Sequence, residues 1–316
     1  MAVAEHGQTQ ALPGQALYLP AQQGRRRDKW WRTAAPYVFI SPFYIVFLAF
    51  GLLPIIFSLA VSMFDWRAVS PGGFVGLNNY WVLLNDPTFY QALRNTFIVW
   101  IGSVPTMTIL ALVFAVMLNS RRTRFRGVFR TVYFLPIVTS LVVAGLIFGL
   151  IFSTTSGLAN RVLEVFGLPA INWLGDPAWM KTSLILALLW RWIGHDMVIM
   201  LAGLQQIPPE VYEAARVDGA SEFQIFWRIT VPLMRPAIVF VAIISTIGTF
   251  NLFEEPYVLF GRRVMDQAAV VTGTYLYQNS FVFFKLGYGA AIAWVIALII
   301  VVLSMVQLKL GGRDAS

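Results

Sequence analysis

The chain carries, from Pro208 to Pro236, the stretch PPEVYEAARVDGASEFQIFWRITVPLMRP, which is polar and lies between two long apolar runs. Proline suits the first turn of a helix and not its interior, so the two opening prolines end one helix and can start another. The acidic residues and good helix formers of 210–215 predict a short helix with negative groups near its dipole-positive end. Asp218-Gly219 then predicts a turn or a helix C-cap.

A second short helix is predicted from Glu222 to Arg228, with Ser221 as its N-cap. Its aromatic residues are spaced i, i+3 and i+4 and would form one face. Small residues gather between the two helices, where the backbone of a partner could approach closely. The pattern therefore favours a docking loop, although a connector lying on the bilayer surface would also explain the aromatic face. The aromatic residues are Phe223, Phe226 and Trp227, and the small ones are Ala214, Ala215, Gly219 and Ala220.

The composition is that of a membrane protein. Of the 316 residues, 58% are hydrophobic and 12% are charged, whereas soluble domains are about 45–50% apolar and about 25% charged. The absence of cysteine excludes disulfides, thiolate metal sites and a lipidated N-terminal cysteine. Only two histidines are present, His6 and His195, so an all-histidine metal site is excluded too. We therefore expect no metal and no cofactor.

Six apolar runs each approach the about 20 residues that a helix needs to cross the hydrocarbon core. They predict an all-α, polytopic membrane protein with six transmembrane helices in contact with the lipid bilayer. The fifth run is the shortest, and its helix could continue beyond Phe253. The runs are Tyr37–Met63, Asn95–Leu118, Phe129–Phe152, Thr182–Gly203, Pro236–Phe253 and Leu286–Leu308.

The basic residues orient these six runs. If the N-terminus is cytoplasmic, 15 of the 23 Lys and Arg residues lie in inside segments, 7 lie in outside loops, and Arg191 lies within a span. The positive-inside rule then places both termini and the 208–236 segment in the cytoplasm. The net charge of +8 is thus accounted for by membrane orientation, and no nucleic-acid partner is predicted.

The fourth run carries Trp190-Arg191-Trp192-Ile193-Gly194-His195-Asp196 near its middle, where one charge costs about 2.5–3.5 kcal/mol. In a structural interpretation, Arg191 pairs with Asp196 or with a carbonyl of a neighbouring helix. In a functional one, polar groups of the fourth and fifth runs line a substrate path and a tryptophan offers a stacking face. Bonding of the fifth run's polar side chains to their own helix is the alternative for that run. The candidate path residues are Trp190, Trp192, His195, Asp196, Ser245, Thr249 and Asn251.

The sequence contains none of the common catalytic motifs that we sought. No GxxxxGK[ST] occurs, so the loop that cradles nucleotide phosphates is missing, and GxSxG and HExxH are missing as well. We therefore expect no catalytic residues, and the chain is not expected to be an enzyme.

The 208–236 segment resembles the EAA loop of the permease subunits of ABC importers. The family pattern is Glu-Ala-Ala, a glycine four residues later, and Ile-x-Leu-Pro. This chain has Glu213-Ala214-Ala215, Gly219 and Ile229-Thr230-Val231-Pro232, with valine in place of leucine. The longer pattern of the sugar-importing branch, which contains the larger maltose-type permease subunit, is also matched. Those matches are Leu204-Gln205, Ile207-Pro208, Tyr212 and Asp218-Gly219-Ala220.

This resemblance extends over about Trp30 to Leu310 and departs from the family's usual turn at 260–266. It implies a permease domain at 29–310, followed by a cytoplasmic tail at 311–316. The start of the chain is rich in Ala, Gln and Gly and has no sustained periodicity, which predicts a disordered cytoplasmic tail at 1–28. The resemblance also implies a cytoplasmic coupling loop that docks on the ATPase. The coupling residues would be Glu213, Ala214, Ala215, Asp218, Gly219, Ala220, Phe223, Ile229 and Pro232.

As a function, the resemblance implies inward movement of a mono- or oligosaccharide across the bacterial cytoplasmic membrane, driven by ATP hydrolysis on a separate subunit. The implied partners are a second related permease subunit, two copies of a cytoplasmic ABC ATPase and an extracytoplasmic sugar-binding protein. Two alternatives remain at this point. One is an ion-coupled secondary transporter in which Arg191, His195 and Asp196 form a relay, and the other is a membrane scaffold that transports nothing.

Overall fold

The computed structural model describes residues 25–68, 70, 72–120 and 124–312, and side chains from Trp31 onward except that of Arg32. Of the two predicted tails, residues 1–24 and 313–316 lie outside this description, whereas 25–28 and 311–312 belong to helices. The chain divides into two compact units, Met1–Phe57 and Ser58–Ser316. The described residues form helices and a few isolated β-bridges, so the predicted all-α class is confirmed.

The first unit is a long apolar helix. It consists of α1 (Arg25–Phe47), a π-helical turn (Leu48–Leu52) and the beginning of α2 (Leu53–Val61). Thr33–Val61 is long and apolar enough to cross a membrane. The helix continues through Pro36 and Pro42, as transmembrane helices often do.

Three further continuous helices could each span a membrane: α4 (Pro87–Asn119), α8 (Pro177–Leu204) and α15 (Leu286–Gly312). Helices α4 and α8 begin in the same way, with an aspartate as N-cap and a proline at the first helical position. Asp86 accepts a hydrogen bond from the Thr88 amide at 2.8 Å, and Asp176 accepts one from the Ala178 amide at 2.9 Å. Such caps satisfy amides that have no partner within the helix.

The third apolar run is bent: α5 (Arg126–Val138) and α6 (Leu141–Ile151) meet at 98°, because Thr139 and Ser140 adopt extended backbone conformations between them. The fifth run forms the single helix α12 (Arg235–Phe250), which the preceding helical segment Glu222–Leu233 of the 208–236 loop meets at 65°. If each bent pair counts as one span, the described residues provide up to six spans, the predicted number.

The helix of the fifth run does not continue beyond Phe253, in contrast to the possibility that the sequence suggested. Helix α12 ends at Phe250, and α13 (Glu254–Phe260) starts a separate helix. The sequence favours this restart, because Glu254 and Glu255 place negative charge in the first turn and Pro256 suits that turn.

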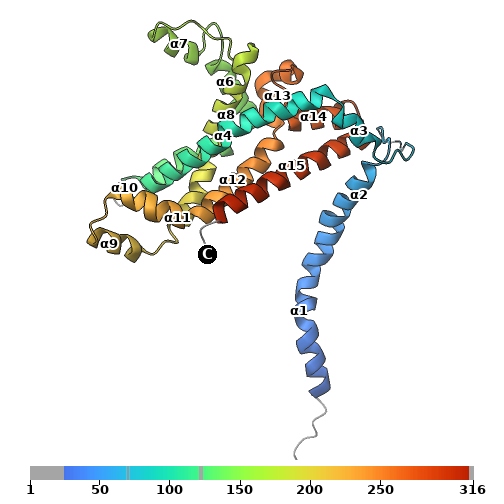
Figure 1. Cartoon of the computed structure of the whole chain (residues 1–316), viewed down its shortest axis with the longest axis horizontal. Helices are drawn as coiled ribbons and strands as arrows, with labels where there is room; N and C mark the ends of the chain where they lie inside the picture. The colour runs from blue at the N-terminus through green and yellow to red at the C-terminus, as the bar shows by residue number, and fades with distance from the viewer. Residues whose placement is uncertain (1–24, 69, 71, 121–123, 313–316) are drawn as a thin grey trace, which may run out of the picture. The chain divides into compact units, whose positions relative to one another are not determined.

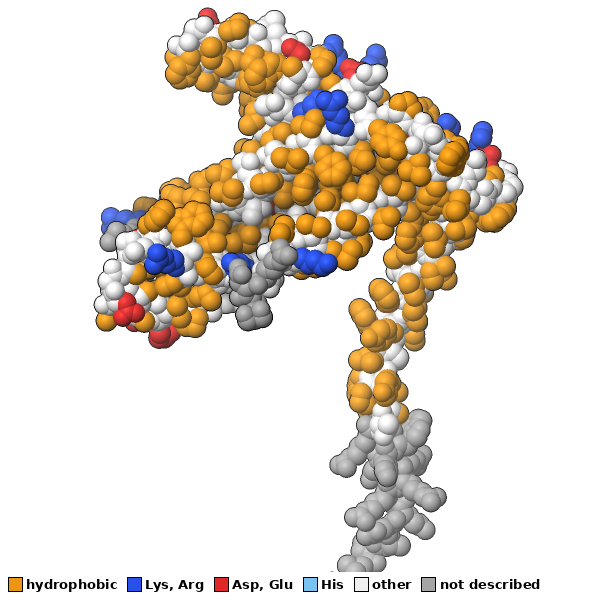
Figure 2. All heavy atoms as spheres, in the orientation of Figure 1, with side chains coloured by type: hydrophobic (Ala, Val, Ile, Leu, Met, Phe, Trp, Pro, Cys, Tyr) orange, Lys and Arg blue, Asp and Glu red, His pale blue; other side chains and the backbone are white. Residues whose placement is uncertain are grey.

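Short elements connect these helices: α3 (Asn78–Leu84), α7 (Leu158–Val165), a 3₁₀ turn (Gly261–Met265), and α14 (Thr272–Tyr277), which leads into a π-helical turn (Gln278–Val282). Within the second unit, α4 packs against α8 and α12, and α12 packs against α15 (Figure 1). Apolar side chains cover much of the visible face of α4 and α15 (Figure 2), as expected for helices that face lipid.

A glycine sets the crossing of α5 over α8. A Cβ atom at Gly194 would lie 1.7 Å from the carbonyl oxygen of Tyr133, so no larger residue fits without moving a backbone. Close backbone approach at small residues is the usual way in which transmembrane helices pack.

Candidate functional site

A cavity of about 290 Å³ lies where α8, α12 and α13 meet, with polar side chains set in a mostly apolar wall. Helix α8 contributes Trp192, His195 and Asp196, while α12 contributes Ser245 and Thr249, with Asn251 directly after its end. The fold therefore brings together six of the seven residues that the sequence suggested for a substrate path.

Asp196 is the buried centre of this cluster, with 2% of its surface exposed. One carboxylate oxygen lies 3.1 Å from His195 Nδ1, and the other accepts a hydrogen bond from the Ser245 hydroxyl at 3.1 Å. A buried carboxylate without such partners would be costly. The bond to Ser245 also joins α8 to α12 in the wall of the cavity.

Thr249 and Asn251 line the cavity but donate to their own helix. The Thr249 hydroxyl donates to the Ser245 carbonyl at 2.8 Å, and the Asn251 amide donates to the Ile247 carbonyl at 2.9 Å. This is the local bonding expected of such residues in an apolar helix. The Thr249 hydroxyl oxygen and the Asn251 amide oxygen still have capacity to accept hydrogen bonds.

Trp190 lies apart from the other six candidates. Residues two apart on a helix do not face the same way, so Trp190 points away from the side on which Trp192 lines the cavity. Its ring packs edge-on against Phe148, with 5.3 Å between the ring centroids.

Arg191 does not pair with Asp196. Its Nε lies 3.5 Å from Glu255 Oε1, and its guanidinium donates to the Thr139 carbonyl at 3.2 Å. The predicted contact with a carbonyl of a neighbouring helix is therefore present, at the break between α5 and α6. Trp192 donates its indole N–H to the same Glu255 oxygen at 3.3 Å.

Glu254 and Glu255 both line the cavity, and the sequence analysis missed them. A signal was present, since two adjacent carboxylates directly follow the shortest apolar run, and the buried Arg191 needs a partner of opposite charge. Helix α13 lies outside the candidate spans. Burial raises the pKa of the Glu255 carboxyl, while its own backbone amide, Trp192 and Arg191 oppose that shift.

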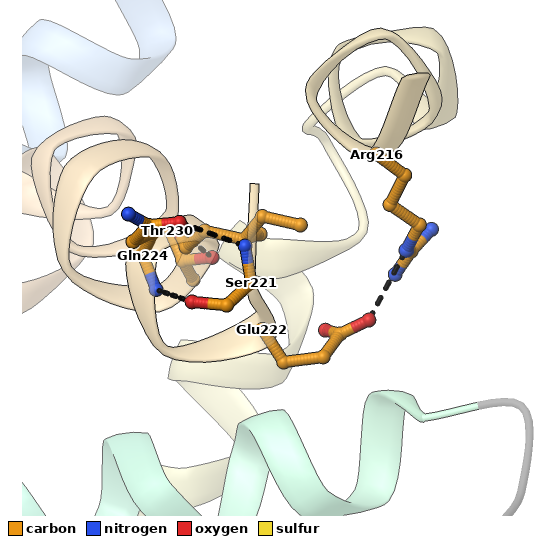
Figure 3. A network of polar contacts seen from close by, with 6 residues as sticks. Arg216, Ser221, Glu222, Gln224 and Thr230 are labelled. Atoms are coloured by element: carbon orange, nitrogen blue, oxygen red, sulfur yellow. Dashed lines mark hydrogen bonds and ion pairs between the residues drawn. The ribbon is translucent and has the colours of Figure 1, made fainter. Parts of the chain in front are cut away.

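The predicted coupling loop forms a second site, away from the cavity along the chain. Helix α9 (Pro209–Val217) ends just before Gly219, whose φ of +79° is a conformation that glycine adopts at little cost. Ser221 then caps α10 (Glu222–Ile225) in a capping box with Gln224, with bonds of 3.3 Å and 2.8 Å (Figure 3). An ion pair of 3.1 Å between Arg216 and Glu222 links the two helices (Figure 3).

The second helix of this loop runs further than the predicted end at Arg228. After α10 the backbone makes a π-helical turn (Phe226–Thr230) and continues as α11 (Val231–Leu233). The wider turn has a physical reason in Pro232, which has no N–H to donate and whose ring would clash with the carbonyl four residues earlier.

The tip of the loop is exposed, whereas its base is not. Phe223 is 73% exposed and Trp227 is 55% exposed, and their ring centroids lie 6.3 Å apart. Phe226 instead packs against the core formed by α4 and α8. Glu213, Ala214, Asp218 and Gly219 are exposed, while Ala215, Ala220, Ile229 and Pro232 are half-buried. Exposed apolar patches of this kind mark sites of interaction with a protein or a membrane.

A separate group of polar side chains links helices α4, α14 and α15 by hydrogen bonds. Asp86 Oδ2 accepts hydrogen bonds from the hydroxyls of Tyr275 and Tyr288, the latter at 3.0 Å. Burial alone would raise the pKa of Asp86, but the bonds from Tyr275, Thr88 and Tyr288 outweigh it and hold the pKa below its usual value. Burial and the bond to Asp86 raise the pKa of Tyr275, so this phenol keeps its proton.

Comparison with known proteins gives consistent results. Residues 107–311 match the family model described as "Binding-protein-dependent transport system inner membrane component". The arabinooligosaccharides transport system permease protein AraP of Bacillus subtilis (strain 168) is 40% identical over 296 residues, covering 92% of this chain and 93% of AraP. The lactose transport system permease protein LacF of Rhizobium radiobacter is 39% identical over 275 residues, covering 86% of this chain and 92% of LacF.

A solved structure shares the fold. It is a chain of a bacterial ABC transporter involved in the import of the acidic polysaccharide alginate, with a TM-score of 0.77. The match covers 92% of this chain and 100% of that chain at 24% identity.

Proposed function

The chain belongs to the family of binding-protein-dependent transport system inner membrane components, and from that premise we propose that it moves a sugar inward as the permease subunit of an ABC importer. The resemblance to carbohydrate ABC permeases found in the sequence is confirmed. The ion-coupled alternative finds no support in the relatives. ATP hydrolysis on a separate subunit would drive the transport.

The proposal that the substrate is a sugar rests on the cavity between α8, α12 and α13. Sugars are held by a few convergent polar groups beside an aromatic or apolar face, and the cavity combines Trp192 with the oxygens of Asp196, Thr249 and Glu255. Polar side chains are tolerated at membrane depth where they line a cavity that water can enter. At about 290 Å³, the cavity is at the lower end of the about 300–1,000 Å³ range of small-molecule sites.

The coupling loop supports the proposed energy source. Its exposed tip, with Phe223 and the small residues around Gly219, suits docking on a cytoplasmic ATPase, of which two copies would be present. The capping box and the Arg216–Glu222 ion pair hold the two short helices in one arrangement. A push on the tip would therefore reach α12 through the 65° bend.

The remaining partners follow from the family. Its description names a binding protein, for which an extracytoplasmic sugar-binding protein is the proposed partner, and a second related permease subunit would complete the pore. Both termini and the 208–236 loop would face the cytoplasm, as the positive-inside rule requires.

Uptake by membrane vesicles loaded with ATP tests this function. With radiolabelled arabinooligosaccharides or lactose as the probe, uptake is expected to stop when the partner ATPase is inhibited with vanadate and to continue when a protonophore collapses the proton gradient. The opposite pattern, loss with the protonophore and persistence with vanadate, would overturn the proposal in favour of ion coupling.

A further inference from the structure

The ionisable side chains that line the cavity are mainly acidic. Asp196, Glu254 and Glu255 line it, and among the described lining residues there is no Lys or Arg. His195 can offset one of these charges only when it is protonated.

The nearest cation does not change the sign of the cavity. Arg191 pairs with Glu255, but it does not itself line the cavity. Arg191 and Glu255 together line a separate pocket of about 20 Å³, and Arg191 is not among the residues that line the larger cavity. Its guanidinium is also held by the Thr139 carbonyl, so it is not free to turn toward a ligand.

Carboxylates in a partly dry site favour some ligands over others. They accept strong hydrogen bonds from hydroxyl groups, of which a sugar has many. They repel a second anion, and the repulsion is stronger in a site of low dielectric constant than in water. A carboxylate on the ligand would thus meet like charge and find no cation within reach.

On the premise that this cavity is the sugar path of the proposed function, we infer that it accepts uncharged sugars and rejects sugar acids, and that Glu254, Glu255 and Asp196 make this selection. Glu254 is exposed, whereas Asp196 is buried. An acidic sugar in the cavity would therefore meet both an exposed and a buried carboxyl group.

The test compares D-galactose with D-galacturonate, which differ only in a hydroxymethyl or a carboxylate group on the same ring. Binding of each is measured by saturation-transfer NMR on the whole transport complex, purified through a tag on this chain and without the binding protein. We expect galacturonate to bind at least tenfold more weakly than galactose at pH 7. Glu254→Gln should narrow this difference several-fold, chiefly because galacturonate binds more tightly once the charge is removed.

Two further variants complete the design. The double variant Arg191→Gln/Glu255→Gln removes both charges together, so no unpaired buried charge is left to destabilise the protein. It should also narrow the difference in binding between galactose and galacturonate. Glu164→Gln, which changes an exposed carboxylate on α7, should leave the difference between galactose and galacturonate binding unchanged.

The outcomes separate the inference from the function on which it rests. Equal binding of the two sugars to the unaltered complex would overturn the selection by charge and leave the sugar site standing. Gly248 lines the cavity with open space around its Cβ position, so Gly248→Phe should block the site. If galactose binds equally well to Gly248→Phe, or binds to no form of the complex, the sugar path does not lie in this cavity and the inference fails, while vesicle uptake decides the proposed function separately.

Discussion

Ser245 on α12 donates its hydroxyl hydrogen to Asp196 on α8, with 3.1 Å between the two oxygens. These residues lie 49 positions apart in the chain, and both line the cavity. The carboxylate also contacts His195, so it is held in place from two sides.

Asp196→Asn is expected to lower sugar uptake only a few-fold to about tenfold. The amide oxygen can still accept the Ser245 hydroxyl, so the loss corresponds to about one weakened hydrogen bond, or about 0.5–1.5 kcal/mol. Initial rates in ATP-loaded vesicles measure the effect, with co-purification of the ATPase as the control for assembly. A proton relay through this carboxyl would instead be abolished, so complete loss of uptake in an assembled complex contradicts the prediction.

Gly219→Val is expected to leave the chain inserted but to weaken transport and co-purification of the ATPase. The φ of +79° is strained for residues with a side chain, by about 1–2 kcal/mol and more for a β-branched one. No atom lies within 4 Å of the Cβ position, so the cost comes from the backbone alone. Gly219→Asn is the matched control, because asparagine tolerates this conformation. If both variants transport normally, the loop does not need its glycine turn.

Gly194→Ala is expected to destabilise the protein by about 1–3 kcal/mol, because its new methyl group meets the Tyr133 backbone at the crossing of α5 and α8. The thermal unfolding midpoint in detergent, followed by fluorescence-detected size exclusion, reports the loss. Gly149→Ala provides the comparison, since that glycine of α6 has open space around it. Removing a helical glycine there should be neutral or stabilise by about 0.5–1 kcal/mol. Equal unfolding midpoints for Gly194→Ala and Gly149→Ala would show that the close approach of α5 and α8 does not limit stability.

Asp86→Asn is expected to lower stability at pH 7 by about 1–2 kcal/mol, because hydrogen bonds to a charged acceptor are replaced by bonds to a neutral one. The pKa of Asp86 in the folded state lies below its usual value of 3.8. The extra stability is therefore present above pH 3.8 and is lost as the pH falls through the depressed pKa. The difference between the two proteins should disappear on acidification.

Asp176→Asn is the matched control for this prediction. Asp176 caps α8 in the same Asp-Pro arrangement in which Asp86 caps α4, and asparagine is a good N-cap in both places. At pH 7 the thermal unfolding midpoint should be lower for Asp86→Asn than for the unaltered protein and nearly unchanged for Asp176→Asn, and the deficit of Asp86→Asn should close as the pH is lowered. A similar fall in both would mean that the caps matter and the tyrosine bonds do not.

How far the sequence predicts the site can be judged from particular residues. Trp192, His195 and Asp196 were identified because charged and polar groups are costly in an apolar run, and the cavity contains all three. Glu255 was missed because its meaning depends on Arg191 and Trp192, and Trp192 is 63 residues away. Trp190 is close to Trp192, His195 and Asp196 in the sequence, but helical geometry places it on a different side of α8.

By itself, the sequence determined the all-α class, the apolar runs and the turn at Gly219. These features depend on residues within a few positions of one another: an apolar run long enough to span the bilayer, a cap, or a glycine that permits a positive φ. Only the tertiary structure decided that Arg191 pairs with Glu255, that the third run breaks at Thr139, and that Asp86 binds Tyr275 and Tyr288. In a bilayer every buried polar group needs a partner, and which partner it finds is set by how helices distant in the chain pack together.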